Sequence, residues 1–194
     1  GQGADTVFSQ MASETTGISF DKVFIVSTQD TDLTPFDTGA YASRQSFVTG
    51  TAVKECAQQL KQKILEYART LVPGNVDRLE LEDGYILADG KPAISLEDLA
   101  MESYYSLSNS SVLTAEVSRQ VKKNTVASGC CFAEVEVDMK LGKIKVLDIV
   151  NVHDSGTLLN PQLAAMQVHG GMFMGIGYGV SEQLLIDEKT GRPL

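Results

Sequence analysis

Residues 132–152 read FAEVEVDMKLGKIKVLDIVNV, and this stretch decides the fold class. Apolar and acidic residues alternate from Phe132 to Met139, which is the period-two pattern of a strand with one buried face. Leu141-Gly142 predicts a turn, and the apolar run from Ile144 to Val152 predicts the returning strand. An antiparallel hairpin is therefore expected here. The acidic side chains on its predicted solvated face are Glu134, Glu136 and Asp138.

Helical periodicity surrounds this hairpin on both sides. Apolar residues recur at three- and four-residue spacing in several segments, and residues that favour helix ends stand at the limits of these segments. The predicted helices are residues 4–16, residues 41–71, residues 95–105 and a last helix that Asn160-Pro161 opens.

Shorter apolar runs predict the remaining strands. A second hairpin is expected over residues 79–87 around the Asp83-Gly84 turn. Val23–Val26 and Leu184–Ile186 are predicted to be further strands. The order of elements predicts a mixed α+β fold, in which helices pack on a largely antiparallel sheet. A serine-rich link at residues 106–111 predicts a boundary between two lobes.

Composition excludes several classes of protein. The chain has 194 residues and a net charge of −9, from 16 basic and 25 acidic residues. This charge argues against binding to nucleic acid or to an anionic membrane. The apolar segment Met166–Val180 is too short and too polar to cross a bilayer. The cysteines Cys56, Cys130 and Cys131 have neither disulfide-framework nor zinc spacing, which predicts a reducing compartment and buried thiols.

Three polar clusters are candidate binding sites. The first is Gly1-Gln2-Gly3 with Thr6, at the start of the first predicted helix. Its glycines let a ligand approach the backbone, and the N–H groups of a first helical turn favour an anion. The third glycine of a dinucleotide fingerprint is absent. A simple helix cap is the alternative interpretation.

The second cluster, Asp37–Gln45, ends a long polar loop at the start of the longest predicted helix. Ala40 and Ala42 leave room for a wide ligand. The helix dipole, Ser43 and Arg44 suit a phosphate or pyrophosphate. Ordinary N-capping with a solvated arginine is the alternative.

The third cluster lies on the last predicted helix, where Gln167 heads a face formed by Gly171, Gly175 and Gly179. Each mid-helix glycine costs about 1 kcal/mol relative to alanine, so this face predicts either close helix packing or a flat cofactor. Close packing is the more common explanation. His169 is a weaker candidate, because such a histidine is more often a packing or surface residue than a ligand. The His153-Asp154 pair is also weaker, because adjacent strand residues point apart.

In this order, the clusters resemble the molybdenum-binding subunit of the xanthine dehydrogenase and aldehyde oxidase family of molybdenum hydroxylases. The similarity covers nearly the whole chain and implies a fold of the molybdenum cofactor-binding domain type. The matching segments are Gly1–Gly3 with Thr6, Gly39–Arg44, Gly50–Val53, Cys131–Asp138, Val152–Gly156, Leu159–Pro161, Gln167 and Gly170-Gly171.

The resemblance implies a molybdenum–molybdopterin cofactor whose metal is held by the pterin dithiolene and not directly by protein side chains. Whether the pterin carries a cytosine dinucleotide is left open. By similarity, Gln2 and Gly3 meet the pterin or the oxygen side of the metal, Ala42 lies near the metal, and Gln167 donates to the pterin. The cofactor-binding residues that the resemblance implies are Gln2, Gly3, Thr6, Ala40, Ala42, Ser43, Arg44 and Gln167.

The resemblance further implies hydroxylation of an N-heterocycle or an aldehyde with water as the oxygen source. Electrons would leave through 2Fe-2S and FAD centres on partner chains or domains. The catalytic glutamate of the family has no match here, nor do its upstream cofactor and substrate motifs. We therefore expect residues 1–194 to be part of a cytoplasmic, oligomeric enzyme and to be inactive alone. The alternatives are a non-catalytic module for a phosphorylated ligand and a structural module of a larger complex.

Overall fold

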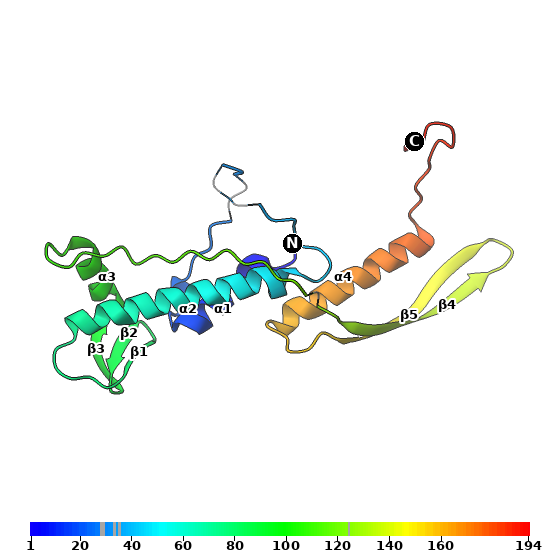
Figure 1. Cartoon of the computed structure of the whole chain (residues 1–194). Coiled ribbons are helices and arrows are strands. Elements are labelled where there is room, and N and C mark those ends of the chain that lie inside the picture. The colour runs from blue at the N-terminus through cyan, green and yellow to red at the C-terminus, as the bar shows by residue number, and fades with distance from the viewer. Residues whose placement is uncertain (28–29, 33, 35, 124) are drawn as a thin grey trace. The chain divides into compact units, whose positions relative to one another are not determined.

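The computed structural model describes residues 1–27, 30–32, 34, 36–123 and 125–194. Within these residues the chain forms two compact units, residues 3–125 and residues 126–194 (Figure 1). The division follows Thr125, downstream of the serine-rich link at residues 106–111. The predicted loop over residues 27–39 lies partly outside the described residues, at positions 28, 29, 33 and 35.

Two helices pack on each other in the first unit. Helix α1 spans Ala4–Thr16 and helix α2 spans Gln45–Leu71. Val7 and Phe8 of α1 are buried. Gly50 of α2 lies so close to α1 that an added Cβ would be 3.2 Å from the Met11 side chain. The missing side chain at Gly50 therefore lets the two helices approach closely.

The predicted bounds hold for α1 but not for the start of α2. Helix α1 ends at Gly17 in the left-handed conformation, as predicted. Helix α2 begins four residues after the predicted Tyr41. The reason is local, because Ala42 and Ser43 have φ angles of 52° and 58°, which a right-handed helix does not contain.

A three-stranded antiparallel sheet follows, in the order β1-β2-β3. The strands are β1 (Leu79–Glu82), β2 (Tyr85–Ala88) and β3 (Lys91–Ser95). The first two form the predicted hairpin, and Asp83-Gly84 has the positive φ angles of 47° and 78° that a type I′ turn requires. The sequence did not predict β3, because Pro92 and Lys91 are unusual in a strand.

Helix α3 spans Leu96–Tyr105, as predicted, and its N-cap Ser95 accepts a hydrogen bond from the Asp98 N–H at 3.0 Å. The core of the first unit lies between α2, the sheet and α3. Its buried members are Ile64, Tyr67, Ala68, Leu79, Leu81, Ile86 and Leu99.

Tyr67 supplies a test of this core. Among the described residues, Tyr67 Oη is the buried side-chain polar atom without a hydrogen-bond partner. Burial, and then the nearby charge of Glu102, raises the pKa of this phenol. An unsatisfied buried polar group costs about 1–3 kcal/mol. We expect Tyr67→Phe to leave the free energy of unfolding unchanged or to raise it by up to that amount, as measured by urea unfolding.

The matched control is Tyr104→Phe, because Tyr104 is 70% exposed in α3. We expect this change to alter stability by less than about 0.5 kcal/mol. A clear loss of stability in Tyr67→Phe would show that the hydroxyl stabilises the core.

After α3 an extended segment returns along α2 (Figure 1). We name residues 109–123 and 125 the strap. Its contacts with α2 run in antiparallel order, beginning with Asn109 Nδ2, which donates to Thr70 Oγ1 at 2.8 Å. Lys63 Nζ donates to the Thr114 carbonyl at 2.6 Å, and Cys56 Sγ donates to the Ala115 carbonyl at 3.2 Å. The strap is thus attached to α2 at successive points.

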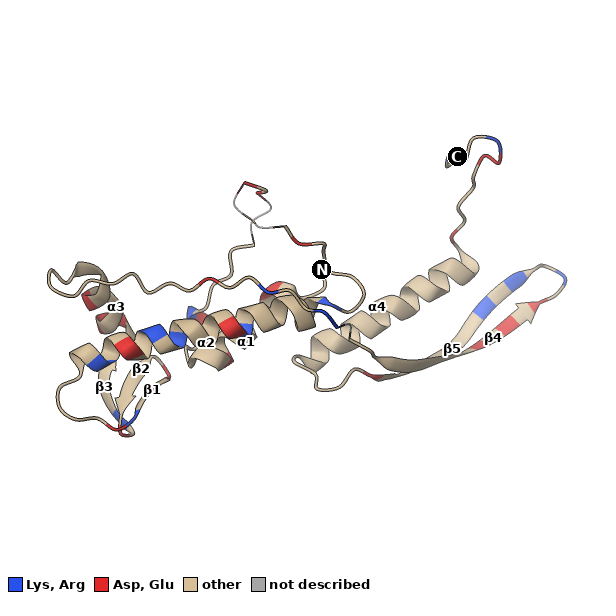
Figure 2. Cartoon of the chain, viewed as in Figure 1, with Lys and Arg blue, Asp and Glu red and all other residues tan. Residues whose placement is uncertain are grey.

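The second unit contains a two-stranded antiparallel ribbon and one helix. Strand β4 spans Ser128–Asp138, β5 spans Lys143–Asp154 and α4 spans Pro161–Val180. The predicted hairpin is confirmed and is longer than expected. Glu136 and Asp138 lie opposite Lys145 and Lys143 at the tip of the ribbon, which Figure 2 shows as adjacent red and blue segments.

Helix α4 begins as predicted, with Asn160 Oδ1 accepting the Leu163 N–H at 3.0 Å and Pro161 at the first helical position. It contains no Asp, Glu, Lys or Arg, and it is uniformly tan in Figure 2. Within the described residues, no helix combines the length and the apolar character needed to cross a membrane.

Three further sequence predictions are wrong. Val23–Val26 forms no strand, and Phe24 is 84% exposed. Leu184–Ile186 forms only an isolated bridge between Ile186 and Pro193. Both runs have the composition of strands, but among the described residues neither lies beside a strand with which to form a sheet. Cys130 and Cys131 are exposed rather than buried, like the other residues of β4.

Candidate cofactor-binding site

The loop before α2 is closed by an internal ion pair. Arg44 Nη1 lies 2.6 Å from Asp37 Oδ1 and 2.8 Å from the Gly39 carbonyl oxygen. The same carboxylate oxygen accepts the Gly39 N–H at 2.8 Å. The Arg44 guanidinium also lies over the Tyr41 ring, at 5.8 Å from its centroid. Residues 37–44, which we name the α2 loop, therefore form a tightly bonded turn.

The ion pair is maintained by the carboxylate form of Asp37. The hydrogen bond from the Gly39 N–H, and then the contact with Arg44, lowers the pKa of Asp37 below its usual range. A lowered folded-state pKa stabilises the fold above the unfolded pKa, and this stabilisation is lost as the pH falls through the folded value. The Asp37 carboxylate is therefore ionised at neutral pH, which is the form that pairs with Arg44.

A pocket of about 370 Å³ lies where the α2 loop, the first turn of α2 and the strap meet. The loop contributes Tyr41, Ala42 and Arg44, and α2 contributes Phe47 and Val48. The strap contributes Arg119, Gln120, Val121, Lys123 and Thr125.

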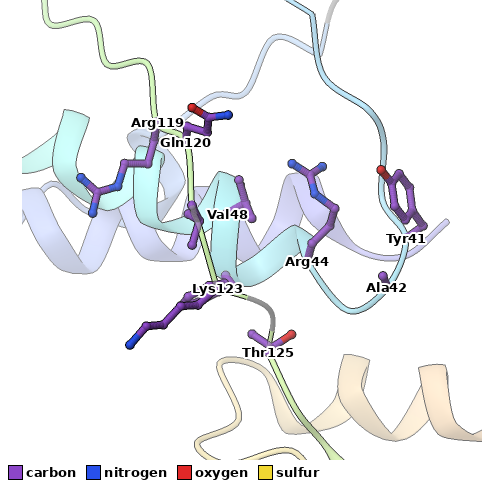
Figure 3. Close-up of a pocket in the computed structure, with 10 residues that line it drawn as sticks. Tyr41, Ala42, Arg44, Val48, Arg119, Gln120, Lys123 and Thr125 are labelled. Atoms are coloured by element: carbon purple, nitrogen blue, oxygen red, sulfur yellow. The ribbon is translucent and has the colours of Figure 1, made fainter.

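The charged residues that line this pocket are all basic, and two of them are paired with carboxylates outside the lining. Of the described lining residues, Arg44, Arg119 and Lys123 are cationic and none is acidic. Figure 3 shows the Arg44 guanidinium beside Tyr41 on one side of the start of α2, whereas the charged ends of Arg119 and Lys123 extend to the other side. Arg119 pairs with Glu55 of α2 at 3.3 Å. An anionic ligand with an apolar part suits this lining.

The sequence-predicted site residues fall into separate groups. Ala40, Ala42, Ser43 and Arg44 all lie in the α2 loop, where Ala42 and Arg44 line the pocket. Gly3 is the N-cap of α1 in the left-handed conformation, with a φ of 83°, and Thr6 is exposed one turn later. Gln2 precedes this cap. Gln167 is exposed on α4, in the second unit.

Sequence reasoning missed the strap residues. Arg119, Lys122 and Lys123 form a short basic run in a strongly acidic chain, and this contrast is the signal that could have directed attention to the segment. Its proximity to residue 42 could not be predicted, because about eighty residues separate the two parts of the pocket.

The glycine face of α4 is open within the described residues. A Cβ added at Gly171, Gly175 or Gly179 would meet nothing within 4 Å. The helix itself is as predicted, but the expected close approach of another surface to this face stays a prediction.

The two histidines lie in different surroundings. His153 Nδ1 lies 3.1 Å from Asn151 Oδ1, and its ring packs over Gly129, where an added Cβ would be 2.6 Å from Nδ1. Asp154 Oδ1 instead accepts the Gly156 N–H at 3.0 Å. His169 is exposed on α4. Among the described residues, no group of three or more His, Cys, Asp or Glu side chains could hold a metal ion.

This combination of helices and antiparallel strands belongs to a known class. The family model of the molybdopterin cofactor-binding domain matches residues 1–194, and the chain belongs to this family.

Two curated relatives are similar to the chain in sequence. The chain is 47% identical to the xanthine dehydrogenase molybdenum-binding subunit of Escherichia coli O157:H7, over 98% of this chain and 26% of that protein. It is 27% identical to the nicotine 6-hydroxylase large subunit of Paenarthrobacter nicotinovorans, over 96% of this chain and 24% of that protein. The chain thus spans about a quarter of the length of these relatives.

Solved structures share the fold. Quinoline 2-oxidoreductase from Pseudomonas putida 86 matches 97% of this chain and 25% of its own chain, with 25% identity and a TM-score of 0.79. CO dehydrogenase from Oligotropha carboxidovorans matches 100% of this chain and 24% of its own, with 27% identity and a TM-score of 0.81. The predicted mixed α+β class, of the molybdenum cofactor-binding domain type, is confirmed.

Proposed function

We propose that the chain contributes one wall of the molybdopterin site in a molybdenum hydroxylase related to xanthine dehydrogenase. The observation that supports this most directly is the cationic pocket at the start of α2 in a chain of this family. When bound, the molybdenum–pterin cofactor supplies the chemistry that hydroxylates a substrate carbon with oxygen from water, releasing two electrons and two protons. The substrate class is a small N-heterocycle or an aldehyde.

The residues of the α2 loop fit the phosphate end of such a cofactor. A guanidinium has five N–H donors, and among the described residues the loop contacts of Arg44 use only Nη1. The donors on Nε and Nη2 can therefore meet a phosphate while Asp37 holds the side chain in place. Ala42 has a small side chain at the pocket wall, which leaves room for a broad ligand.

The other proposed contacts come from all three polar clusters. In this proposal Gln2, Gly3 and Thr6 meet the pterin side of the cofactor. Ala40 and Ser43 flank the phosphate contacts, and Gln167 donates to the pterin ring. The cofactor is a molybdopterin, and its cytosine dinucleotide form is an open part of the proposal.

The proposed assembly is larger than this chain. The rest of a molybdenum subunit would supply the catalytic base, and 2Fe-2S and FAD centres on partner chains or domains would accept the electrons. We propose a cytoplasmic, oligomeric enzyme, in which the 194-residue chain is inactive when isolated.

Removal of the Arg44 side chain tests the proposal. Hydrogen bonds to charged groups contribute about 1.5–3 kcal/mol each, and every 1.4 kcal/mol changes affinity tenfold. We expect Arg44→Ala in the intact subunit to weaken cofactor retention by about 10- to 150-fold. Molybdenum and pterin content are measured after gel filtration at low and high salt. The difference from the wild type should be larger at low salt, because high salt screens the same charge contact in the wild type.

The matched control is Arg78→Ala. Arg78 also forms an ion pair, with Glu80 Oε1 at 2.7 Å, but it lies in the sheet region and is 74% exposed. This variant should retain the cofactor. Equal retention by Arg44→Ala and Arg78→Ala would contradict the proposed phosphate contact. A phosphorylated ligand without molybdenum in the wild-type protein would instead support the non-catalytic module.

A further inference from the structure

The α2 loop contains a strained backbone turn. Ala42 and Ser43 are consecutive non-glycine residues with φ angles of 52° and 58°. Residues with a Cβ disfavour this left-handed region, and such a pair persists only where surrounding contacts hold it. The turn lies directly before α2 and places Ala42 at the wall of the pocket. Its conformation therefore determines the shape of the candidate site.

One contact that holds this turn comes from far along the chain. Thr125 Oγ1 donates a hydrogen bond to the Ser43 carbonyl oxygen at 3.1 Å, across 82 positions of sequence. The acceptor belongs to one of the two strained residues, so the bond acts at the turn itself. Thr125 also lines the pocket. Other contacts of the turn are local, such as the hydrogen bond that the Arg44 N–H donates to the Tyr41 carbonyl oxygen at 3.1 Å.

The strap brings Thr125 close to the turn at Ala42 and Ser43. Its contacts with Lys63, Cys56 and Glu55 attach it to α2 along the helix toward the α2 loop. Figure 1 shows the strap running beside α2 over most of the length of the helix. The strap thus runs from these attachments on α2 to Thr125, which bonds to the turn.

We infer that Thr125 is a positioning residue for the cofactor site, which holds Ala42 and Ser43 in the left-handed conformation that shapes the pocket. The identity of the ligand in this inference rests on the proposed function. The hydrogen bond to Ser43 does not. The strap is then part of the binding site, although no strap residue belongs to the motifs that the sequence analysis identified.

The test compares Thr125→Val with Thr125→Ser in the intact subunit. Valine keeps the shape of threonine but removes the hydroxyl, whereas serine keeps the hydroxyl. Thr114→Val is the matched control, because the Thr114 contact with Lys63 uses the backbone carbonyl. The first readout is hydrogen exchange at the amides of Gly39 and Arg44 in cofactor-free protein. The second is molybdenum and pterin content.

We expect Thr125→Val to speed exchange at these two amides by about five- to tenfold, the effect of losing one ordinary hydrogen bond. Cofactor content should fall by a similar factor. Thr125→Ser and Thr114→Val should match the wild type in both readouts. Adding Ala42→Gly to Thr125→Val should restore cofactor content, because glycine adopts positive φ without strain. A general structural defect would not respond to that second change.

Unchanged exchange in Thr125→Val would overturn the inference, whatever the cofactor content. Faster exchange with full cofactor content would overturn the role of the turn in binding. A third outcome is a wild-type protein that contains no molybdenum or pterin, together with faster exchange in Thr125→Val. This outcome would support Thr125 as the residue that holds the turn, and it would contradict the proposed function. If Thr125→Val does not fold, Thr125→Val and Thr125→Ser are compared in the Ala42→Gly background. Equal exchange at the two amides in that pair would contradict the inference, and faster exchange with valine would support it.

Discussion

Gly17→Ala is expected to destabilise the chain by about 2–5 kcal/mol. Gly17 caps α1 with a φ of 84°, and its N–H donates to the Ser13 carbonyl at 2.9 Å. A left-handed conformation costs a residue with a Cβ roughly 1–2 kcal/mol. The added Cβ would also overlap the Leu81 carbonyl oxygen of β1 and lie 3.0 Å from its carbonyl carbon. Because both are backbone atoms, relief requires α1 and β1 to separate, at a further cost of about 1–3 kcal/mol.

Gly74→Ala is the control that separates these two contributions. Gly74 has a φ of 92°, but an added Cβ there would meet nothing within 4 Å. Only the conformational cost of roughly 1–2 kcal/mol is expected at this position. The free energy of unfolding is measured in urea for both variants. Equal losses of stability would show that the contact between α1 and β1 does not contribute.

The elements that sequence predicted well have local causes. The α1 cap at Gly17, the Asp83-Gly84 turn and the Asn160-Pro161 start of α4 each depend on residues within a few positions. Backbone preferences and capping hydrogen bonds act over that range, so a single sequence is sufficient to identify them.

The elements that sequence predicted badly depend on partners elsewhere in the chain. Val23–Val26 has the composition of a strand, yet a strand requires a neighbour to accept its hydrogen bonds. Composition cannot supply that neighbour. The late start of α2 has a similar origin, since the contact between Thr125 and Ser43 helps to hold a conformation that the local sequence does not favour.

The candidate site shows the same division. The α2 loop was predicted from its small residues and from Arg44, which are local features. The internal use of Arg44 was not predicted, because the ion pair with Asp37 spans seven positions in an irregular loop that has no fixed period. The strap side of the pocket was not predicted either, because about eighty residues of sequence separate it from the α2 loop. Local chemistry thus predicted one side of the pocket, and tertiary contacts determine the other.

Ala42→Phe is expected to have the largest effect on the proposed cofactor site. Ala42 lines the pocket and has a φ of 52°, so a larger side chain is penalised both by volume and by conformation. Overpacking costs about 1–3 kcal/mol, which corresponds to about a 5- to 150-fold loss of affinity. We expect molybdenum and pterin content of the intact subunit to fall accordingly, while the unfolding midpoint changes little because residue 42 is exposed.

A size series makes this expectation specific to the pocket. Ala42→Gly removes volume and relieves the positive φ, so cofactor content should be at least that of the wild type. Ala93→Phe introduces the same aromatic ring at an exposed position of β3, away from the pocket, and should not reduce cofactor content. Retention should therefore fall in the order Gly, Ala, Phe at position 42 alone. If Ala42→Phe bound a full complement of molybdenum and pterin, residue 42 would not face the cofactor, and the pocket at the start of α2 would have to be assigned to another ligand.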